Sequence, residues 1–566
     1  MWDGRLSLCC CTTFTTSLSN TASPIAAAAA AAAVMTDSKA AYNRELYVSN
    51  LRGVQTLPTS LRTVEAEGQK KVPKPAWDYV AGSASTEATY DANRRALDHW
   101  QLVPRMLTAA STESFDMSVR LPALGVATDE EAAEVGAVGK LFPTPLVLCP
   151  IGVLRQLHED KDLAVARAAS ELNIPFSELQ RRCTGSQRGS ADFPSLLLHP
   201  LSHFSLTAMS SASSTPCEKI AEGAEWDPKD SPGKEGWFQL YWPSDDELTA
   251  SILSRAKKAG FTTLVVTLDT WALGWRPRDL DNKGYNPFLH GEGVANIFSD
   301  PVFIEKYCDG KSPLAPGADE EEIGQAAIQA ISLITPGYSR GWEDLKLLRE
   351  LWGTDAPIVL KGIQTPADAL RAVQAGVDGV WVSNHGGRQV DGAIGSLQAL
   401  RSIVHVVHAS ASTSASAQRR SRPAVIFDSG IRTGAGECLL PFPIQQRCSL
   451  TFNVGIPFVS TADIMKALGE GLFSYTSSII IVNLLTLVLV SSALGADLVG
   501  IGRPYAYGLA AYGEEGVTAV LRSLLADLEL NAALAGCKSV AEIRERGTGE
   551  GGQEAVVVRT GAELKL

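Results

Sequence analysis

The sequence predicts an α/β protein built as one (β/α)8 TIM barrel, with a helical segment before the barrel and several insertions within it. Two observations carry this prediction. Short apolar runs alternate with helical patterns along most of the chain, as in parallel βαβ units. Polar residues follow successive apolar runs, as they do on the catalytic rim of such barrels. The 566 residues fit a single barrel with insertions.

Composition excludes several functional classes. The formal net charge of -12 argues against a nucleic-acid partner. The ten cysteines contain no CxxC pair, which favours reduced thiols over a disulfide framework or a zinc site. The apolar run Ile479–Val490 is short for a membrane span and contains polar residues. We therefore expect no metal site and no membrane partner.

Residues 1–40 form a low-complexity segment that we expect to be disordered, and residues 41–566 form the predicted barrel domain. The first 34 residues are rich in Ser, Thr and Ala and include the run Ala26–Ala33. A single arginine is too few for a convincing transit peptide. We expect a cytoplasmic protein, with mitochondria and peroxisomes remaining as alternatives.

Before the barrel, the patterns indicate an entry segment at Tyr42–Gly53 and a helix at Leu61–Lys71. The string W-D-Y-V-A-G-S-A follows at Trp77–Ala84, and a helical stretch runs through Asn93–His99. The barrel itself needs eight strands, and eight apolar runs qualify. They are Leu146–Cys149, a second near Ile174–Phe176 or Phe204–Thr207, Trp237–Tyr241, Thr263–Leu268, Ile358–Leu360, Val377–Val382, Val425–Phe427 and Leu498–Ile501.

The stretch Trp381–Gly392, W-V-S-N-H-G-G-R-Q-V-D-G, ends the sixth run in a polar, Gly-rich turn. His385 can act as a general base near neutral pH. Arg388 can hold a carboxylate in a two-pronged grip. Alone, H-G-G-R is as often a surface turn. Polar residues also follow the other apolar runs. Because the strand ends of a barrel meet on one rim, this pattern favours an active site over a surface turn.

The seventh and eighth runs predict a phosphate site. Gly430, Gly434 and Gly502 expose backbone N–H groups, and Arg432 and Arg503 add positive charge. Phosphate sites after these two strands recur in this barrel type.

Together these motifs resemble the FMN-dependent α-hydroxy-acid dehydrogenase/oxidase family over most of Tyr42–Ile543. The resemblance implies FMN as cofactor, a small L-2-hydroxy acid and O2 as substrates, and a homotetramer. It also assigns catalytic roles. His385 would take a proton from the substrate, and Asp269 would orient His385 and stabilise its protonated form. Tyr241 would hydrogen-bond the substrate hydroxyl, and Arg276 would support developing negative charge.

The same resemblance assigns binding roles. Tyr79 and Arg388 would clamp the substrate carboxylate, with Tyr241 on the hydroxyl. Lys361 would stabilise the reduced, anionic flavin. The residues expected to bind FMN are Pro150, Ile151, Gly152, Ser210, Gln239, Thr267, Lys361, Ser383, Asp428, Gly430, Arg432, Gly502 and Arg503.

Within the family, the string at Thr267–Leu280, T-L-D-T-W-A-L-G-W-R-P-R-D-L, is most similar to lactate 2-monooxygenase. Gly152 in P-I-G-V points the same way, because many oxidases of the family carry Ala there. Such an enzyme converts lactate and O2 to acetate, CO2 and water. The alternative is an oxidase that releases the 2-oxo acid and H2O2. We expect the segment Pro277–Ser332 to form a lid.

Four insertions interrupt the family pattern, near residues 122–138, 177–205, 437–461 and 470–492. The last two separate the helix Ala462–Gly469 from the seventh and eighth strands. Our hypothesis is that several are translated introns, in which case Ile479–Val490 is intron-derived. Genuine long insertions are the alternative. A barrel that no longer binds FMN is then a further interpretation, because the insertions flank the phosphate site.

Overall fold

The computed structural model describes residues 38–121, 124, 140–172, 208–223, 236–354, 356–411, 422–431, 485–549 and 554–560. Of the four predicted insertions, those at 177–205 and 437–461 lie outside the described residues, as do the predicted helix Ala462–Gly469 and the N-terminal 37 residues. Within the described part of the chain, no helix is long and apolar enough to cross a membrane.

Eight strands form one sheet in which every hydrogen-bonded pair is parallel. The order in the sheet is β4-β11-β10-β9-β8-β7-β6-β5. Its two outer strands are consecutive in the chain, and Val153 N donates to Ala212 O at 3.2 Å just beyond their ends. The sheet therefore curls as the predicted (β/α)8 fold requires. The strands are β4 (Leu146–Leu148), β5 (Ala208–Ser210), β6 (Gly236–Tyr241), β7 (Phe261–Thr267), β8 (Ile358–Ile363), β9 (Gly379–Val382), β10 (Ala424–Phe427) and β11 (Leu498–Ile501).

Seven of the eight predicted runs overlap these strands. The second strand differs, because both candidate segments lie outside the described residues and β5 begins directly after the second of them. Large apolar side chains on alternate positions fill the barrel interior, among them Trp237, Val265, Val359 and Trp381. Such packing makes the interior a solid core and leaves the strand ends to carry function.

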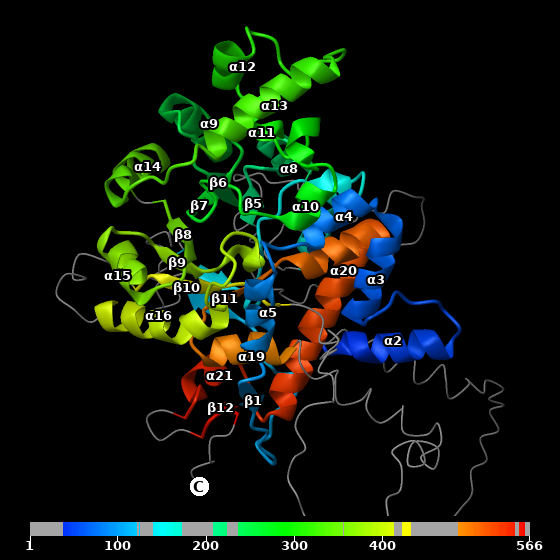
Figure 1. Ribbon diagram of the computed structural model, residues 1–566. Coiled ribbons are helices and arrows are strands. Elements are labelled where there is room, and N and C mark those ends of the chain that lie inside the picture. Colours follow the sequence, from blue (N-terminus) through cyan, green and yellow to red (C-terminus); the bar gives the residue numbers. More distant parts are fainter. Residues whose placement is uncertain are drawn as a thin grey trace, which may run out of the picture.

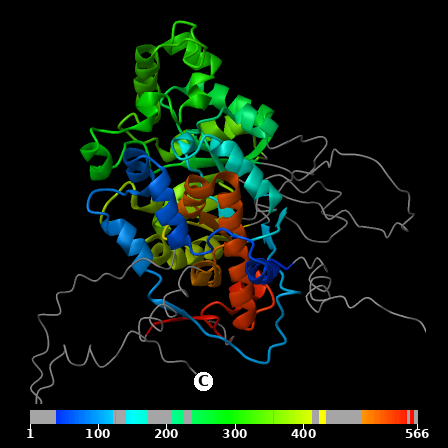
Figure 2. The same ribbon diagram turned by 90° about the vertical axis from the view of Figure 1, so that its right-hand side faces the viewer.

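Helices cover the outside of the sheet (Figure 1). On one side lie α9 (Asp246–Lys258), α14 (Leu345–Trp352), α15 (Pro366–Gln374) and α16 (Ser396–Ala411). On the other side α20 (Arg503–Leu534) packs beside the N-terminal helices, as the turned view also shows (Figure 2). The remaining outer helices are α7 (Lys161–Glu171), α8 (Cys217–Gly223), α19 (Leu485–Ala493) and α21 (Val540–Arg546).

The N-terminal segment is helical, as predicted. Its helices are α2 (Ala41–Leu51), α3 (Leu61–Lys71), α4 (Lys74–Ala81) and α5 (Ala88–Arg95). The predicted helical stretch Asn93–His99 is wrong beyond Arg95. There the chain turns into β1 (Trp100–Leu102), which pairs with β12 (Val557–Arg559), and His99 O accepts from Thr560 N at 2.8 Å. A strand partner far along the chain thus ends the helix.

Helix α19 begins inside the range 470–492 that the sequence predicts to be an insertion and ends one residue beyond it. Val488, Leu489 and Val490 are buried against the barrel, and the helix leads directly into β11. In this structure the last residues of that range therefore serve as the outer helix before the eighth strand. An apolar stretch of this kind can bury its side chains wherever the barrel offers an open face.

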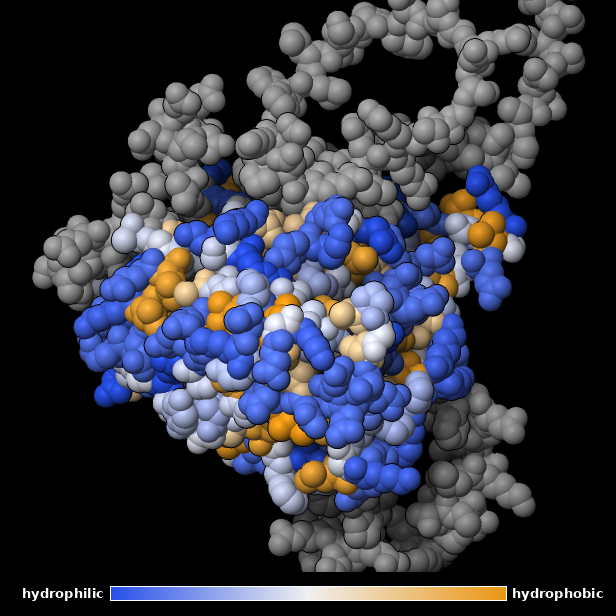
Figure 3. Space-filling view, turned by 90° about the horizontal axis from the view of Figure 1, so that it is seen from above, coloured by the Kyte–Doolittle hydropathy of each residue, from blue (hydrophilic) through white to orange (hydrophobic). Residues whose placement is uncertain are grey.

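The segment predicted to form a lid contains five helices, of which α12 and α13 lie next to α9 at one end of the molecule (Figure 1). The five are α10 (Pro277–Asp281), η3 (Pro287–His290), α11 (Ala295–Phe298), α12 (Pro301–Tyr307) and α13 (Glu320–Ile334). Seen from above, this end of the molecule is mainly hydrophilic, with apolar residues in small separate groups (Figure 3). A small antiparallel pair, β2 (Val119–Leu121) and β3 (Lys140–Phe142), precedes the barrel.

Candidate active site

The turn after β9 holds His385 in a backbone conformation that its neighbours enforce. His385, Gly386 and Gly387 have φ angles of 57°, 66° and 79°. A Cβ on Gly386 would lie 2.7 Å from Arg503 Nη1, and one on Gly387 would lie 2.7 Å from Tyr90 N. The Gly pair is therefore needed both for the left-handed turn and for the close approach of two other segments.

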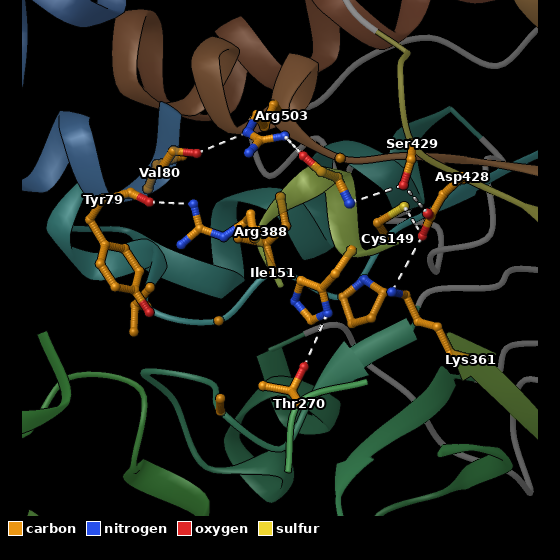
Figure 4. Close-up of a pocket in the computed structure, with 18 of the residues that line it drawn as sticks. Tyr79, Val80, Cys149, Ile151, Thr270, Lys361, Arg388, Asp428, Ser429 and Arg503 are labelled. Atoms are coloured by element: carbon orange, nitrogen blue, oxygen red, sulfur yellow. Dashed lines mark hydrogen bonds and ion pairs between the residues drawn. The ribbon is translucent and has the colours of Figure 1, made fainter. Parts of the chain in front are cut away.

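His385 is bonded to the end of the neighbouring β7 segment. Its Nδ1 lies 2.8 Å from Asp269 Oδ1. It also lies 3.2 Å from Thr270 Oγ1 (Figure 4). Thr270 Oγ1 also donates to Asp269 Oδ1 at 2.9 Å. With Nδ1 donating to the carboxylate, Nε2 of a neutral imidazole is the acceptor. This is the arrangement of a general base oriented by a carboxylate.

The electrostatics of this pair suit proton abstraction. Burial lowers the pKa of His385, as do the charges of Lys361 and Arg276, while Asp269 opposes the shift. For Asp269, burial disfavours the charged form, but the charge and hydrogen bond of His385 and the charge of Lys361 outweigh it and bring the pKa to about 2. At neutral pH, His385 is therefore uncharged and Asp269 is ionised.

This pair predicts the pH dependence of substrate oxidation. The pKa of His385 lies below its ordinary 6.5, so the base is fully available above neutrality and is lost as the pH falls through that pKa. We expect a rate of flavin reduction that is constant above pH 6.5 and declines only at lower pH. Stopped-flow measurement of flavin bleaching from pH 5 to pH 9 checks this. A rate that rises steadily above pH 8 would contradict a neutral His385 as the base.

Two guanidinium groups make the neighbouring wall an anion site. Arg388 and Arg276 both lie over the ring of Tyr79, at 5.0 and 5.9 Å from its centroid. Burial and the charge of Arg276 lower the pKa of Arg388 to about 10. Arg388 Nη1 donates to the carbonyls of Tyr79 and Gly82 at 2.5 and 2.8 Å, which fixes the side chain. A bound carboxylate would relieve the repulsion between the two cations.

Tyr241 completes this end of the site. Its ring stacks on that of His385, with centroids 6.5 Å apart and an interplanar angle of 25°. Burial raises the pKa of Tyr241 to about 12. The phenol therefore stays protonated and can donate to a substrate hydroxyl.

A buried cluster lies at the ends of β8 and β10. Lys361 Nζ is 3.0 Å from Ser383 Oγ. It is also 3.5 Å from Asp428 Oδ2 (Figure 4). Burial disfavours the ammonium form, but the charges of Asp428 and Asp269 raise the pKa of Lys361. Cys149 Sγ also contacts Asp428 Oδ2, at 3.6 Å. Lys361 is therefore a permanent positive charge beneath the barrel mouth.

These groups share one cavity of about 170 Å³. Fourteen of the predicted site residues belong to it, thirteen as lining residues and Asp269 through its bond to His385. The lining members are Tyr79, Pro150, Ile151, Gly152, Tyr241, Arg276, Lys361, His385, Arg388, Asp428, Gly430, Gly502 and Arg503. Among the described lining residues, five are Lys or Arg and one, Asp428, is a carboxylate. Such a cavity suits a ligand or ligands with several negative charges.

Four predicted FMN ligands, Ser210, Gln239, Thr267 and Ser383, are not among the residues that line this cavity. Ser210 Oγ donates to Gln239 Oε1 at 2.7 Å, and Ser383 accepts from Lys361. Thr267 is paired with Lys361 in the β7–β8 register. Gln239 Nε2 and Thr267 Oγ1 are buried and have no hydrogen-bond partner among the described residues. Arg432 lies outside the described residues.

Arg503 is held differently from the prediction of a phosphate ligand. Its guanidinium donates to the carbonyls of Val80, Gly386 and Gly82 at 3.0, 3.1 and 2.8 Å (Figure 4). In this structure Arg503 therefore ties the end of α4 to the His385 turn. Arg94, one turn from Tyr90 on α5, supplies another cation to the same part of the cavity.

Sequence reasoning missed the contribution of α5. Tyr90, Asn93 and Arg94 line the cavity, and the side chains of Asn93 and Asn384 donate to each other at 2.8 and 2.7 Å. The only local signal was the helical pattern, which does not say which face a helix turns to a site. A reciprocal amide pair between residues 291 positions apart depends on the tertiary fold.

Gly152 has a packing explanation. A Cβ at this position would lie 2.2 Å from Ala212 O, so the loop after β4 needs glycine to pack against the loop after β5. This requirement holds whatever product the enzyme releases, and it removes Gly152 as an argument for one outcome of the reaction.

The cavity fits a flavin mononucleotide. The unpartnered Gln239 Nε2 and Thr267 Oγ1 offer a donor and an acceptor to a ring edge. Lys361 supplies a buried positive charge, and the arginines and glycines at the other end suit a phosphate.

Comparison with known proteins decides the family. The family model described as FMN-dependent dehydrogenase matches residues 68–180, 202–436 and 486–548, more than half of the chain. The chain belongs to this family. Its cofactor is therefore FMN, and it is an oxidoreductase that acts on 2-hydroxy acids.

Relatives and solved structures agree with this assignment. The FMN-dependent alpha-hydroxy acid dehydrogenase qulF of Penicillium citrinum is 34% identical over 504 residues, covering 89% of this chain and 94% of the relative. An L-lactate oxidase of Lysinibacillus sphaericus is 30% identical over 500 residues, covering 88% and 95%. A crystal structure of mandelate oxidase matches with a TM-score of 0.55 and 26% identity, covering 86% of this chain and 97% of the other.

Proposed function

We propose that this flavoenzyme oxidises a small L-2-hydroxy acid, with lactate as the first candidate, in a lactate 2-monooxygenase-like reaction. Lactate and O2 would give acetate, CO2 and water. The observation that carries the proposal is the placement of the His385–Asp269 pair and the Arg276–Arg388 pair around one cavity. A base and a carboxylate clamp are what a 2-hydroxy acid needs. The string Thr267–Leu280 supports the monooxygenase outcome, and by family resemblance we infer a homotetramer.

Each residue of the site has a distinct role in this proposal. Arg388 and Arg276 hold the substrate carboxylate, and Tyr79 closes over them. Tyr241 donates a hydrogen bond to the hydroxyl, and His385 Nε2 accepts a proton from the substrate. Asp269 stabilises the imidazolium that results. FMN, when bound, supplies the two-electron acceptor, and Lys361 is the group that would support negative charge on its ring.

The alternative outcome is an oxidase that releases the 2-oxo acid and H2O2. The similarity to an L-lactate oxidase favours this candidate. The two outcomes share every residue named above, because they diverge only after substrate oxidation.

One experiment tests the proposal and separates these outcomes. Purified protein is scanned for flavin absorbance, mixed anaerobically with L-lactate, and then exposed to air. We expect flavin bands that bleach with L-lactate and not with D-lactate, followed by acetate as the product. Hydrogen peroxide and pyruvate in place of acetate would assign the oxidase. A protein that takes up no FMN would support a barrel that its insertions have inactivated.

A further inference from the structure

A second cavity lies beside the active site. It has a volume of about 240 Å³ and is separated from the first by residues that line both, namely Tyr241, Thr270 and Ile334. Four aromatic side chains line its far part, from Trp242, Trp271, Tyr338 and Trp342. A single layer of side chains therefore divides the active-site cavity from this second cavity, which we call the aromatic cavity.

This layer of side chains lies next to the reacting atoms. Thr270 Oγ1 lies 3.2 Å from His385 Nδ1, and the Tyr241 ring stacks on that of His385. Thr270 is also bonded to the catalytic pair, since it donates to Asp269. Ile334 is the remaining member of this layer and the only one without a polar role.

Ile334 is also firmly placed. It is the last residue of α13, is 7% exposed, and belongs to the main hydrophobic core. Ile331, one turn earlier, lines the active-site cavity as well. With Leu273 and Phe288, these residues form the apolar part of the active-site lining. Once the arginines hold the carboxylate, this apolar lining is what remains for the substrate side chain.

We propose that Ile334 sets the length of side chain that the enzyme accepts, by closing the active-site cavity off from the aromatic cavity. This inference rests on the proposed oxidation of 2-hydroxy acids. The substrate class is then L-2-hydroxy acids with a short apolar side chain, of which lactate is the smallest chiral member. A side chain with a second carboxylate is rejected, because the apolar lining leaves that charge without a partner.

The test is Ile334→Ala. Shortening the side chain to a methyl group joins the two cavities and gives an aromatic side chain access to Trp242, Trp271 and Trp342. We expect kcat/KM for L-3-phenyllactate to rise at least about 10-fold, the scale at which apolar pockets discriminate. We expect kcat/KM for L-lactate to fall severalfold, chiefly through KM, because the apolar side chain of Ile334 can neither accept the proton nor bind the carboxylate.

Ile328→Ala is the matched control. Ile328 lies on the same helix, six residues earlier, but its side chain is exposed to solvent at 58%. This variant changes the helix composition equally and should leave both substrates unaffected. Binding of pyruvate and phenylpyruvate is measured alongside by isothermal titration calorimetry on the FMN-loaded proteins. These ligands share the carboxylate but need no turnover, so the cavity is probed even if oxidation fails.

The outcomes separate the two proposals. If phenylpyruvate binds more tightly to Ile334→Ala and not to Ile328→Ala, the result supports the proposal that Ile334 separates the two cavities. This holds whether or not lactate is oxidised. A wild-type protein that binds pyruvate but bleaches with no 2-hydroxy acid defeats the proposed function alone. Wild-type protein that oxidises L-3-phenyllactate as well as L-lactate overturns the inference. So does a folded, FMN-bound Ile334→Ala variant with no gain for either aromatic ligand.

Discussion

Replacing His385 with Gln will lower the rate of flavin reduction by L-lactate by about 10²–10⁴-fold, the usual contribution of a positioned general base. Gln keeps a polar side chain in the turn but cannot accept a proton at neutral pH. The loss should appear in kcat and in kcat/KM alike, because His385 acts on the reacting proton and not on the carboxylate. Anaerobic stopped-flow spectroscopy at saturating lactate measures it.

The variant should still fold and bind FMN. His385 contacts Asp269 and Thr270 through its ring, while the neighbouring Gly386 and Gly387 make the close backbone approaches. His405→Gln on the exposed face of α16 is the matched control, and it should reduce flavin at the wild-type rate. A His385→Gln protein that retains FMN and bleaches at more than about a tenth of the wild-type rate would exclude His385 as the base.

Replacing Arg388 with Met will lower kcat/KM for L-lactate by about 10²-fold or more. Removing one partner of a buried, hydrogen-bonded ion pair costs about 2–5 kcal/mol, and each 1.4 kcal/mol is a factor of about ten. Arg388 is buried beside Arg276 and Tyr79, where a carboxylate is the natural counter-ion. Arg388→Lys keeps the charge but loses the planar fork, so it should recover only part of the loss.

Arg388 also bonds to the carbonyls of Tyr79 and Gly82, so a structural effect must be separated from a binding effect. Methyl L-lactate lacks the carboxylate charge. If Arg388 acts on that charge, Arg388→Met lowers kcat/KM for the acid far more than for the ester. Equal losses would assign Arg388 to the support of α4. Arg371→Met on the exposed surface of α15 is the control for a lost arginine.

Local features of the sequence were enough to predict many of the residues that the structure brings together around one cavity. His385 and Arg388 stand in a Gly-rich turn after an apolar run, and Lys361 ends another run. Both patterns depend on neighbours in the chain, since a parallel strand that is buried on both faces appears as an apolar run and a left-handed turn favours glycine. The helical stretch predicted at Asn93–His99 is longer than the helix in the structure, because the end of this helix does not depend on neighbours in the chain. Its end is set by pairing of β1 with β12, more than four hundred residues away.

By itself, the sequence determined the barrel and the rim on which its polar residues lie, because these follow from short-range periodicity and from residue types at strand ends. The cofactor followed from the resemblance of the motifs to a known family. Only the tertiary structure decided which groups touch. The hydrogen bond between His385 and Asp269 joins positions 116 residues apart. The Asn93–Asn384 pair joins α5 to the catalytic turn. Ile334 lies between the two cavities and lines both. Such contacts depend on how separate elements pack, because a side chain's partners across a fold are not encoded by its spacing along the chain.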